Sequence, residues 1–488
     1  MNEILLTLEP QKVWYYFKEI LEIPRPSKKE DKIRDYLIRF GKDHRLETLT
    51  DEVGNVLIKK PATPGMENRK TVILQSHIDM VCEKNSDVDH DFEKDPIEVY
   101  IEEGWVKAKG TTLGADDGIG VAATLAILDS DDIKHGPLEA LFTVDEETGL
   151  TGAFGLKPGF LEGSILLNLD SEDEGQLFIG CAGGQDTLAW LPFDKEPAPD
   201  GFIAFEINVS GLVGGHSGDD INKNRGNANK ILNRFLWENL KAFDLKLHNF
   251  DGGNLRNAIA REAKAIVLTP PTKEEALKNE LNSYLTMIKA EFHSTEPHLS
   301  MSLNPVQTPE WVVDDESAFE LLNAIYACPH GVIAMSQDIE NFVETSTNLA
   351  SVKFKEDEIL ITTSQRSSVE SRKQDVTNMV VSVFNLAGAK TQTSDGYPGW
   401  TPNPKSEIVD LTSKLYTRLF NEQPEVLAIH AGLECGLIGD KYPGMDMISY
   451  GPTIKGAHSP DERIEIESVK KFWELTLKIL ENIPEKTN

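Results

Sequence analysis

Four short apolar runs in this chain each lead directly into acidic residues or a histidine. The runs are 71–76, 138–144, 165–169 and 447–450, and they precede His77-x-Asp79, Asp145-Glu146-Glu147, Asp170 and a loop with His458. Such runs are typical of buried strands, and in open α/β sheets ligands bind beyond the carboxyl ends of the strands. Histidine, aspartate and glutamate provide the donor atoms that divalent cations need. The sequence therefore predicts a metal site at one edge of an α/β sheet.

A further pair of carboxylates stands at the start of a predicted helix. Gly114-Ala115-Asp116-Asp117-Gly118 precedes the apolar stretch 119–128. Aspartate is common at a helix N-terminus because its side chain accepts hydrogen bonds from free N–H groups. Capping accounts for one of the two aspartates better than for both. The other has two oxygens with which it can bridge two cations.

The length of 488 residues exceeds what one core of ordinary size holds, so two domains are expected, with three as the alternative. Strands and helices alternate up to about residue 185, where a stretch rich in glycine and proline begins. A second such stretch covers 393–404. We predict that 1–185 and 395–488 form one domain and that 186–394 is inserted as a second.

Local patterns predict several individual elements. Ser27-x-x-Glu30 has the form of a capping box for a helix that carries Ile33 and Leu37. The segment 51–55 between two extended runs predicts a hairpin turn. Apolar periodicity predicts helices near 226–242 and 466–482.

Composition narrows the possible partners. The formal net charge of −31 would repel nucleic acid and anionic membranes, so we expect neither as a partner. The apolar run within residues 1–10 is too short for the core of a signal peptide, and no later run is long enough to span a bilayer. The sequence therefore predicts a cytoplasmic protein. The four cysteines are scattered without a Cys-x-x-Cys pair, so no disulfide framework or zinc knuckle is expected.

Taken in order, the motifs resemble those of the co-catalytic di-zinc exopeptidases, a family that includes carnosinases, aminoacylases and tripeptidases. Within that family, the segments 111–116, 179–184 and 430–436 are similar to those of bacterial aminoacyl-histidine dipeptidases. The resemblance covers essentially the whole chain. It implies an α/β fold, in which a layered mixed-sheet di-zinc exopeptidase catalytic domain carries an inserted α+β lid domain.

The same resemblance implies a cofactor of two Zn²⁺ per chain, with Co²⁺ or Mn²⁺ as substitutes. His77 and Asp170 would bind one zinc, Glu147 and His458 the other, and Asp116 both. Asp79 would orient His77, and Glu146 would be the general base. Three ligand carboxylates and a bridging hydroxide would match the charge of two divalent cations.

The inserted domain is expected to recognise the substrate. By resemblance, His216 would polarise the scissile carbonyl, and Asn257 and Arg366 would hold the C-terminal carboxylate of the substrate. Gly432 is expected to let the backbone approach the substrate. Arginine suits a carboxylate because its planar fork donates two parallel hydrogen bonds, and Arg256 and Arg261 are competing candidates. His430 and Glu434 are expected to line the pocket. The insertion is long enough for His216 to act within its own chain, in a monomer or a homodimer.

The leading hypothesis is metal-dependent hydrolysis of unblocked dipeptides, with a preference for Xaa-His implied by the resemblance. A zinc-bridged hydroxide would attack the peptide carbonyl while Glu146 takes the proton from water. The alternatives are an N-acyl amino-acid amidohydrolase on the same scaffold and a non-catalytic metal-binding protein. Small dipeptides are the expected partners.

Overall fold

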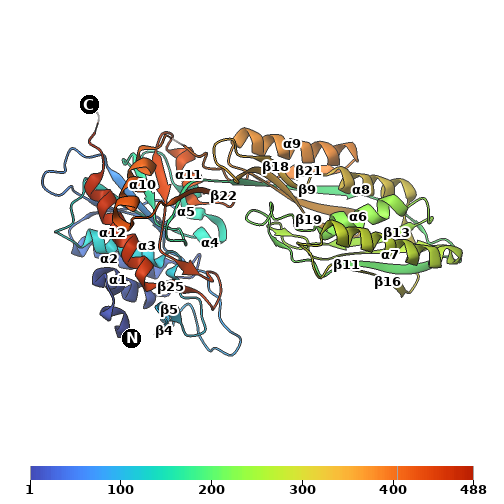
Figure 1. Ribbon diagram of the computed structural model, residues 1–488, viewed down its shortest axis with the longest axis horizontal. Helices are drawn as coiled ribbons and strands as arrows, with labels where there is room; N and C mark the ends of the chain where they lie inside the picture. Colours follow the sequence, from blue (N-terminus) through green and yellow to red (C-terminus); the bar gives the residue numbers. More distant parts are fainter. Residues whose placement is uncertain (1, 404, 487–488) are drawn as a thin grey trace. The chain divides into compact units, whose positions relative to one another are not determined.

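The computed structural model describes residues 2–403 and 405–486. The chain divides into two compact units, coloured along the sequence in Figure 1. Unit 1 comprises Met1–Gly180, Pro402–Ala428 and Leu433–Asn488, and unit 2 comprises Cys181–Thr401 and Ile429–Gly432. The predicted insertion 186–394 falls inside unit 2. Unit 2 begins earlier because residues from Cys181 onward pair with a later segment, Cys181 with Trp400 and Gly184 with Tyr397.

The main sheet of unit 1 has eight strands in the order β1-β2-β6-β3-β7-β23-β8-β22. Their bounds are β1 Glu47–Thr50, β2 Val56–Lys60, β3 Val72–His77, β6 Leu138–Thr143, β7 Ile165–Asn168, β8 Gln176–Cys181, β22 Glu425–Ile429 and β23 Asp446–Ser449. The four predicted apolar runs are β3, β6, β7 and β23, which lie side by side and run parallel. Nearly all their residues are buried, as expected for strands covered on both faces. Their carboxyl ends therefore share one edge of the sheet.

Helices cover this sheet. They are α1 Gln11–Leu21, α2 Asp31–Asp43, α3 Ala115–Leu128, α10 Glu407–Phe420 and α12 Ile466–Asn482, with the short helices η1 Glu3–Thr7, α4 Glu146–Gly149, α5 Thr151–Gly155 and α11 Glu434–Lys441. α3 packs against β3 and α1, and α10 packs against β23 and α12. A four-stranded sheet in the order β24-β25-β5-β4 completes the unit. Its strands are β4 Val99–Glu102, β5 Trp105–Ala108, β24 Ile454–Lys455 and β25 Arg463–Glu465.

Unit 2 is built on a nine-stranded antiparallel sheet in the order β16-β11-β15-β13-β19-β20-β9-β21, with β18 paired to β19. The strands are β9 Gly183–Pro192, β11 Ile203–Ser210, β13 Lys246–Gly252, β15 Ala263–Thr269, β16 Ser300–Val306, β18 Gly331–Met335, β19 Val343–Phe354, β20 Glu358–Ser367 and β21 Lys390–Thr393. Two small sheets pair β10 Lys195–Pro197 with β17 Trp311–Val313 and β12 Gly215–His216 with β14 Ala258–Ile259.

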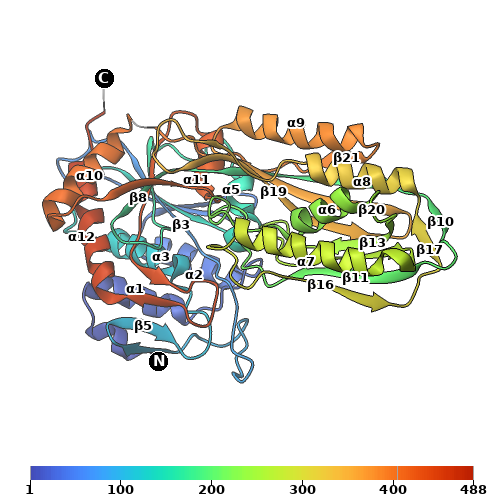
Figure 2. The ribbon, with the colours of Figure 1, turned by 45° about the vertical axis from the view of Figure 1, so that its right-hand side comes forward.

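Four helices pack in unit 2: α6 Ala228–Asn239, α7 Glu274–Glu291, α8 Asp315–Ala327 and α9 Glu370–Leu386, with η2 Pro271–Lys273 before α7. Figures 1 and 2 both show α7 and α8 running alongside the strands of the large sheet. The mixed α/β architecture predicted from the sequence is confirmed. None of the helices in the described ranges combines the length and apolar character needed to cross a membrane.

Most predicted local elements are present, and one is wrong. The helices at 226–242 and 466–482 correspond to α6 and α12, and the hairpin turn joins β1 to β2. The capping box does not form, because α2 begins at Asp31 without a side-chain cap. Ser27 instead donates its hydroxyl to Asp79 Oδ2, and Glu30 Oε1 accepts the backbone N–H of Asp145. Both residues support strand-end loops that lie far away in the sequence.

Candidate metal centre

Five of the predicted ligands meet at the shared edge of the unit 1 sheet. His77 Nε2 lies 3.0 Å from Asp116 Oδ1 and 3.3 Å from Asp170 Oδ1. His458 Nε2 lies 3.2 Å from Asp116 Oδ2 and 3.0 Å from Glu147 Oε2. The side chains thus form two groups of three donors that share Asp116, one oxygen turned toward each histidine. His77 and Glu147 also approach Glu146 closely enough to form a third group.

The donor set fits two divalent cations. Two ligand atoms that bind one tetrahedral zinc at its usual bond lengths stand about 3.4 Å apart. The separations within each group, 3.0 and 3.3 Å around His77 and 3.2 and 3.0 Å around His458, are close to that spacing. Glu147 Oε1 is buried and has no hydrogen-bond partner within residues 2–403 and 405–486. An oxygen in that state needs a positively charged neighbour, which a cation would provide.

The pKa values of the clustered side chains also indicate that added positive charge would stabilise the site. Burial raises the pKa of Glu146 well above its ordinary value although His77 opposes the rise, and burial does the same to the pKa of Asp170. Hydrogen bonds to Asp116 and Glu147 raise the pKa of His458 to about 11. The pKa values of Glu146, Asp170 and both imidazoles are thus shifted toward the protonated forms, because many negative groups share a dehydrated space. Two cations would displace these protons and leave the imidazoles neutral for binding.

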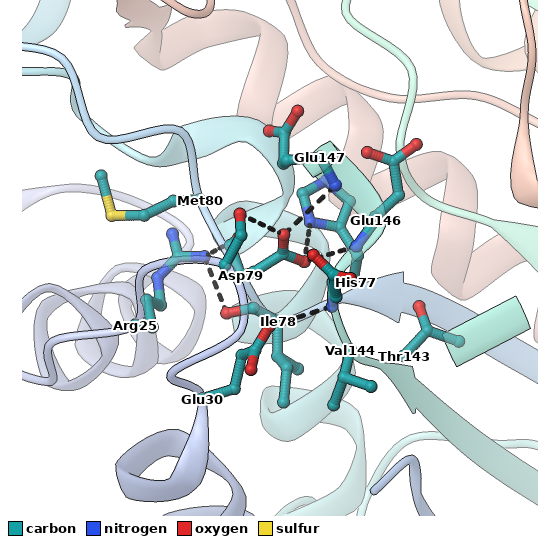
Figure 3. Close-up of polar contacts among 12 residues, drawn as sticks. Arg25, Glu30, His77, Ile78, Asp79, Met80, Thr143, Val144, Glu146 and Glu147 are labelled. Carbon is teal, nitrogen blue, oxygen red and sulfur yellow. Dashed lines mark hydrogen bonds and ion pairs between the residues drawn. The ribbon is translucent and has the colours of Figure 1, made fainter. Parts of the chain in front are cut away.

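Asp79 holds the end of β3 and the following loops together (Figure 3). Asp79 Oδ1 lies 3.4 Å from His77 Nδ1 and accepts the backbone N–H of Glu146 at 3.0 Å, and Asp79 Oδ2 accepts the backbone N–H of Glu147 at 3.2 Å. Burial opposes its ionisation, but the nearby His77 ring and the hydrogen bonds from Ser27 and the Glu146 backbone lower the pKa of Asp79 to about 2. The side chains of Glu146 and Glu147 extend away from the Asp79 carboxylate in Figure 3. A charged Asp79 thus orients the His77 ring and the Glu146–Glu147 backbone together.

Two charged residues that the sequence analysis did not select fix the loops of the site. Arg25 is buried, and its Nη1 donates to the carbonyl oxygens of Ile78 at 3.1 Å and Asp79 at 2.6 Å, while its Nη2 donates to Gly114. Glu462 accepts the backbone N–H groups of the four residues 113–116. The only sequence signal for Arg25 is its position between Pro24 and Pro26 at the end of an apolar helix.

A buried polar layer lies two residues before the strand-end groups, further inside the sheet. Gln75, Thr143 and Asn168 each stand two residues before a strand-end group, and all three are buried. Gln75 Nε2 and Thr143 Oγ1 both donate to Glu434 Oε2 at 2.7 Å, and Asn168 Nδ2 donates to Gln75 Oε1 at 2.6 Å. Glu434 Oε1 has no hydrogen-bond partner among the described residues, and burial raises the pKa of Glu434 to about 7.

We expect Glu434→Gln to flatten the pH dependence of stability in chelator-treated protein. A carboxyl that titrates at about 7 when folded and near 4.5 when unfolded is neutral in both states at low pH. Its contribution to stability is full below 4.5 and is lost as the pH rises through 7. The loss between pH 5 and pH 8 amounts to about 3 kcal/mol, which glutamine avoids.

Urea unfolding followed by tryptophan fluorescence at both pH values measures this difference. Glu474→Gln, an exposed change in the same unit, is the control and should keep the wild-type pH dependence. A Glu434→Gln protein that loses as much stability as the wild type on going to pH 8 would show that Glu434 titrates normally.

In unit 2 the structure gathers the residues predicted to recognise the substrate. His216 on β12 pairs with Ala258 on β14, and Ser217 donates its backbone N–H to the Asn257 carbonyl at 2.8 Å. His216 Nδ1 lies 3.2 Å from Asp219 Oδ2. Arg366 on β20 lies opposite Ser346 on β19, whose Oγ is 2.7 Å from His430 Nε2.

Burial and partners separate the three candidate arginines. Arg256 is exposed and forms an ion pair with Asp186 at 2.9 Å, and Arg261 Nε donates to the Leu212 carbonyl at 3.3 Å. Arg366 is 7% exposed, and no carboxylate in the described ranges lies within the ion-pair distance of 4.0 Å. A buried guanidinium without an anionic partner is costly. Arg366 is therefore the best placed of the three for a substrate carboxylate.

His430 and Glu434 do not share a ligand set. His430 contacts Ser346 within unit 2, whereas Glu434 contacts Gln75 and Thr143 within unit 1. The roles assigned from the sequence to His216, Asn257, Arg366 and Gly432 stay predictions.

The chain is similar to characterised proteins over its whole length. It is 46% identical to the cytosol non-specific dipeptidase of Escherichia coli (strain K12), with 99% of both chains covered. The crystal structure of aminoacylhistidine dipeptidase from Vibrio alginolyticus superimposes with a TM-score of 0.93 at 46% identity, covering 100% of both chains. The aminopeptidase PepT of Bacillus cereus ATCC 10987 shares the fold, with a TM-score of 0.57 at 16% identity over 98% of this chain and 99% of its own.

A family model described as peptidase family M20/M25/M40 matches residues 73–482. That span holds all five residues of the donor set and all four gathered in unit 2. The resemblance seen in the motifs is thus confirmed at the level of the family. The chain belongs to the peptidase family M20/M25/M40.

Proposed function

We propose that this protein is a metal-dependent dipeptidase that hydrolyses unblocked dipeptides, Xaa-His among them. The observation that carries the proposal is the Asp116 carboxylate, whose two oxygens face two different histidine-centred donor groups beside the buried Glu146. The names of the Escherichia coli and Vibrio alginolyticus relatives support a dipeptide substrate, and the name of the Escherichia coli relative supports a cytoplasmic location.

The residues of the site have two proposed roles: five bind the metal ions, and Glu146 transfers a proton. We assign His77, Asp170, Asp116, Glu147 and His458 to two cations, with Zn²⁺ as the metal and Co²⁺ or Mn²⁺ as substitutes. When bound, two divalent cations supply positive charge that acidifies a water and polarises the substrate carbonyl. Glu146 takes the proton of that water and gives it to the leaving amine. The raised pKa of Glu146 fits this task, because a base must hold its proton until the amine departs.

Kinetics on a substrate panel test the proposal. We expect zinc-loaded protein to hydrolyse free dipeptides, with Ala-His among the better ones, and to lose this activity after dialysis against a chelator. N-acetyl amino acids form the second arm of the panel. Turnover of the acylated compounds without turnover of free dipeptides would assign the protein to the amidohydrolases instead. A metal-replete preparation that hydrolyses neither class would rule out both enzymatic functions.

A further inference from the structure

The ring of Tyr397 occupies a slot between two glycines of unit 2. Gly184 and Tyr397 exchange backbone hydrogen bonds of 3.1 and 2.9 Å. A β-carbon added at Gly184 would lie 2.7 Å from ring atoms of Tyr397, and one added at Gly432 would lie 2.9 Å from the ring. Lys373 Nζ donates to the Tyr397 carbonyl at 2.7 Å. The ring and its backbone are thus held tightly before any ligand arrives.

The hydroxyl of this ring contacts the buried arginine. Arg366 Nη1 donates to the Tyr397 hydroxyl oxygen at 3.0 Å, while Arg366 Nε is buried and has no hydrogen-bond partner in the part of the chain that the structure describes. A phenol that accepts one hydrogen bond still has its own O–H to donate. Burial raises the pKa of Tyr397 although Arg366 opposes the rise, so the hydroxyl keeps its hydrogen. Within the described ranges that hydrogen has no acceptor in the protein.

The positions of both groups follow from the sheet. Arg366 on β20 pairs with Gly184 on β9, and Gly184 in turn pairs with Tyr397. The absence of a side chain at Gly184 lets the phenol lie over the strand beside the guanidinium. A cation that lacks a carboxylate and an O–H donor that lacks an acceptor therefore stand together. A single carboxylate group could pair with the cation and accept the hydrogen bond from the O–H group.

We propose that Arg366 and Tyr397 form one carboxylate-binding pair, in which Tyr397 positions the Arg366 fork and donates its own O–H to the C-terminal carboxylate of the substrate. The inference rests on the proposed dipeptidase function and adds a specificity residue to it. The glycine slot fixes the phenol in advance, which lowers the entropy lost when the carboxylate binds. The pair selects free over blocked C-termini, because an amide removes the charge that Arg366 requires.

Tyr397→Phe tests the pair, because it removes only the hydroxyl. We expect the KM for Ala-His to rise about tenfold, the effect of losing one hydrogen bond to a charged group. We expect kcat to stay within about twofold, since the carboxylate takes no part in the bond changes and would be bound equally in the substrate and in the transition state. The kcat/KM for Ala-His amide should be low in the wild type and unchanged in the variant. An unchanged KM for Ala-His, or an equal loss with the amide, would overturn the proposal.

Two further variants separate positioning from general loosening of unit 2. Tyr284 is also buried there, and its hydroxyl donates to the Ile231 carbonyl at 2.8 Å, so Tyr284→Phe is a matched control that should leave the KM unchanged. In an Arg366→Ala background, Tyr397→Phe should add much less than its single effect, because the two groups act on one carboxylate. Full additivity would contradict a pair.

A binding measurement keeps this inference distinct from the proposed function. Calorimetry with zinc-loaded Glu146→Gln protein measures the Kd for Ala-His and for its amide without turnover. We expect the Glu146→Gln/Tyr397→Phe protein to bind Ala-His about tenfold more weakly and to bind the amide unchanged. If the wild type hydrolyses no dipeptide, that result would still support the pair while the proposed function fails. Equal binding of Ala-His by both proteins, or no binding by either, would reject the pair.

Discussion

Glu146→Gln is expected to keep both cations and to lose about a thousandfold in kcat, within the range for removal of a general acid–base residue. Glu146 follows β6 directly and approaches His77 and Glu147, but the two closely spaced donor groups around Asp116 do not include it. Glutamine fills the same volume and cannot take a proton. The metal content of the purified variant, measured by mass spectrometry, and its kcat on Ala-His together check the result.

A second buried acid provides the control for this variant. Glu434 also has a raised pKa because of burial, but its contacts are with Gln75 and Thr143 rather than with the donor groups. Glu434→Gln should therefore reduce kcat by less than about tenfold. Near-wild-type turnover by Glu146→Gln would mean that another group takes the proton. Loss of zinc from Glu146→Gln would instead make Glu146 a ligand.

The pattern of apolar runs followed by acidic residues or histidine predicted the sheet and the donor set, because both depend on local sequence. Consecutive apolar residues such as Val72, Ile73 and Leu74, with no alternating polar residue, are typical of a strand that is buried on both faces and has parallel neighbours. Parallel strands place their following residues at one edge. His77 and Asp170 consequently meet although 92 residues separate them, because β3 and β7 are adjacent.

The supporting residues could not be predicted in this way. Ser27 and Glu30 have the local form of a capping box, yet they bond to Asp79 and to the Asp145 backbone. Glu462 reaches 113–116 across more than 340 residues of sequence. No local periodicity encodes such pairs, since each depends on how separate loops pack. For the same reason the sequence left three arginines open, and only burial and ion pairing favoured Arg366.

Asp116→Asn is expected to release at least one cation per chain and to reduce kcat/KM at least about a hundredfold. Changing a residue that only supports a metal ligand already costs up to about a hundredfold, and changing a ligand should cost at least as much. Among the described residues, Asp116 alone forms ion-pair contacts with both histidines, through separate oxygens at 3.0 and 3.2 Å. Burial opposes its ionisation, but hydrogen bonds from His458 and His77 hold the pKa of Asp116 far below its usual range. Asparagine presents one oxygen and one N–H group, so it cannot hold two cations.

The neighbouring aspartate makes the matched control. Asp117 is buried next to Asp116, accepts the backbone N–H of Gly120 at 3.1 Å through Oδ1, and has its pKa raised well above the ordinary value, mainly by burial. A neutral Asp117 resembles asparagine, so Asp117→Asn should retain both cations and most activity. Metal analysis of the two variants thus compares a bridging carboxylate with a capping one at adjacent positions. Full metal content in Asp116→Asn would require a different bridge, and the arrangement of the two donor groups offers no other shared carboxylate among the described residues.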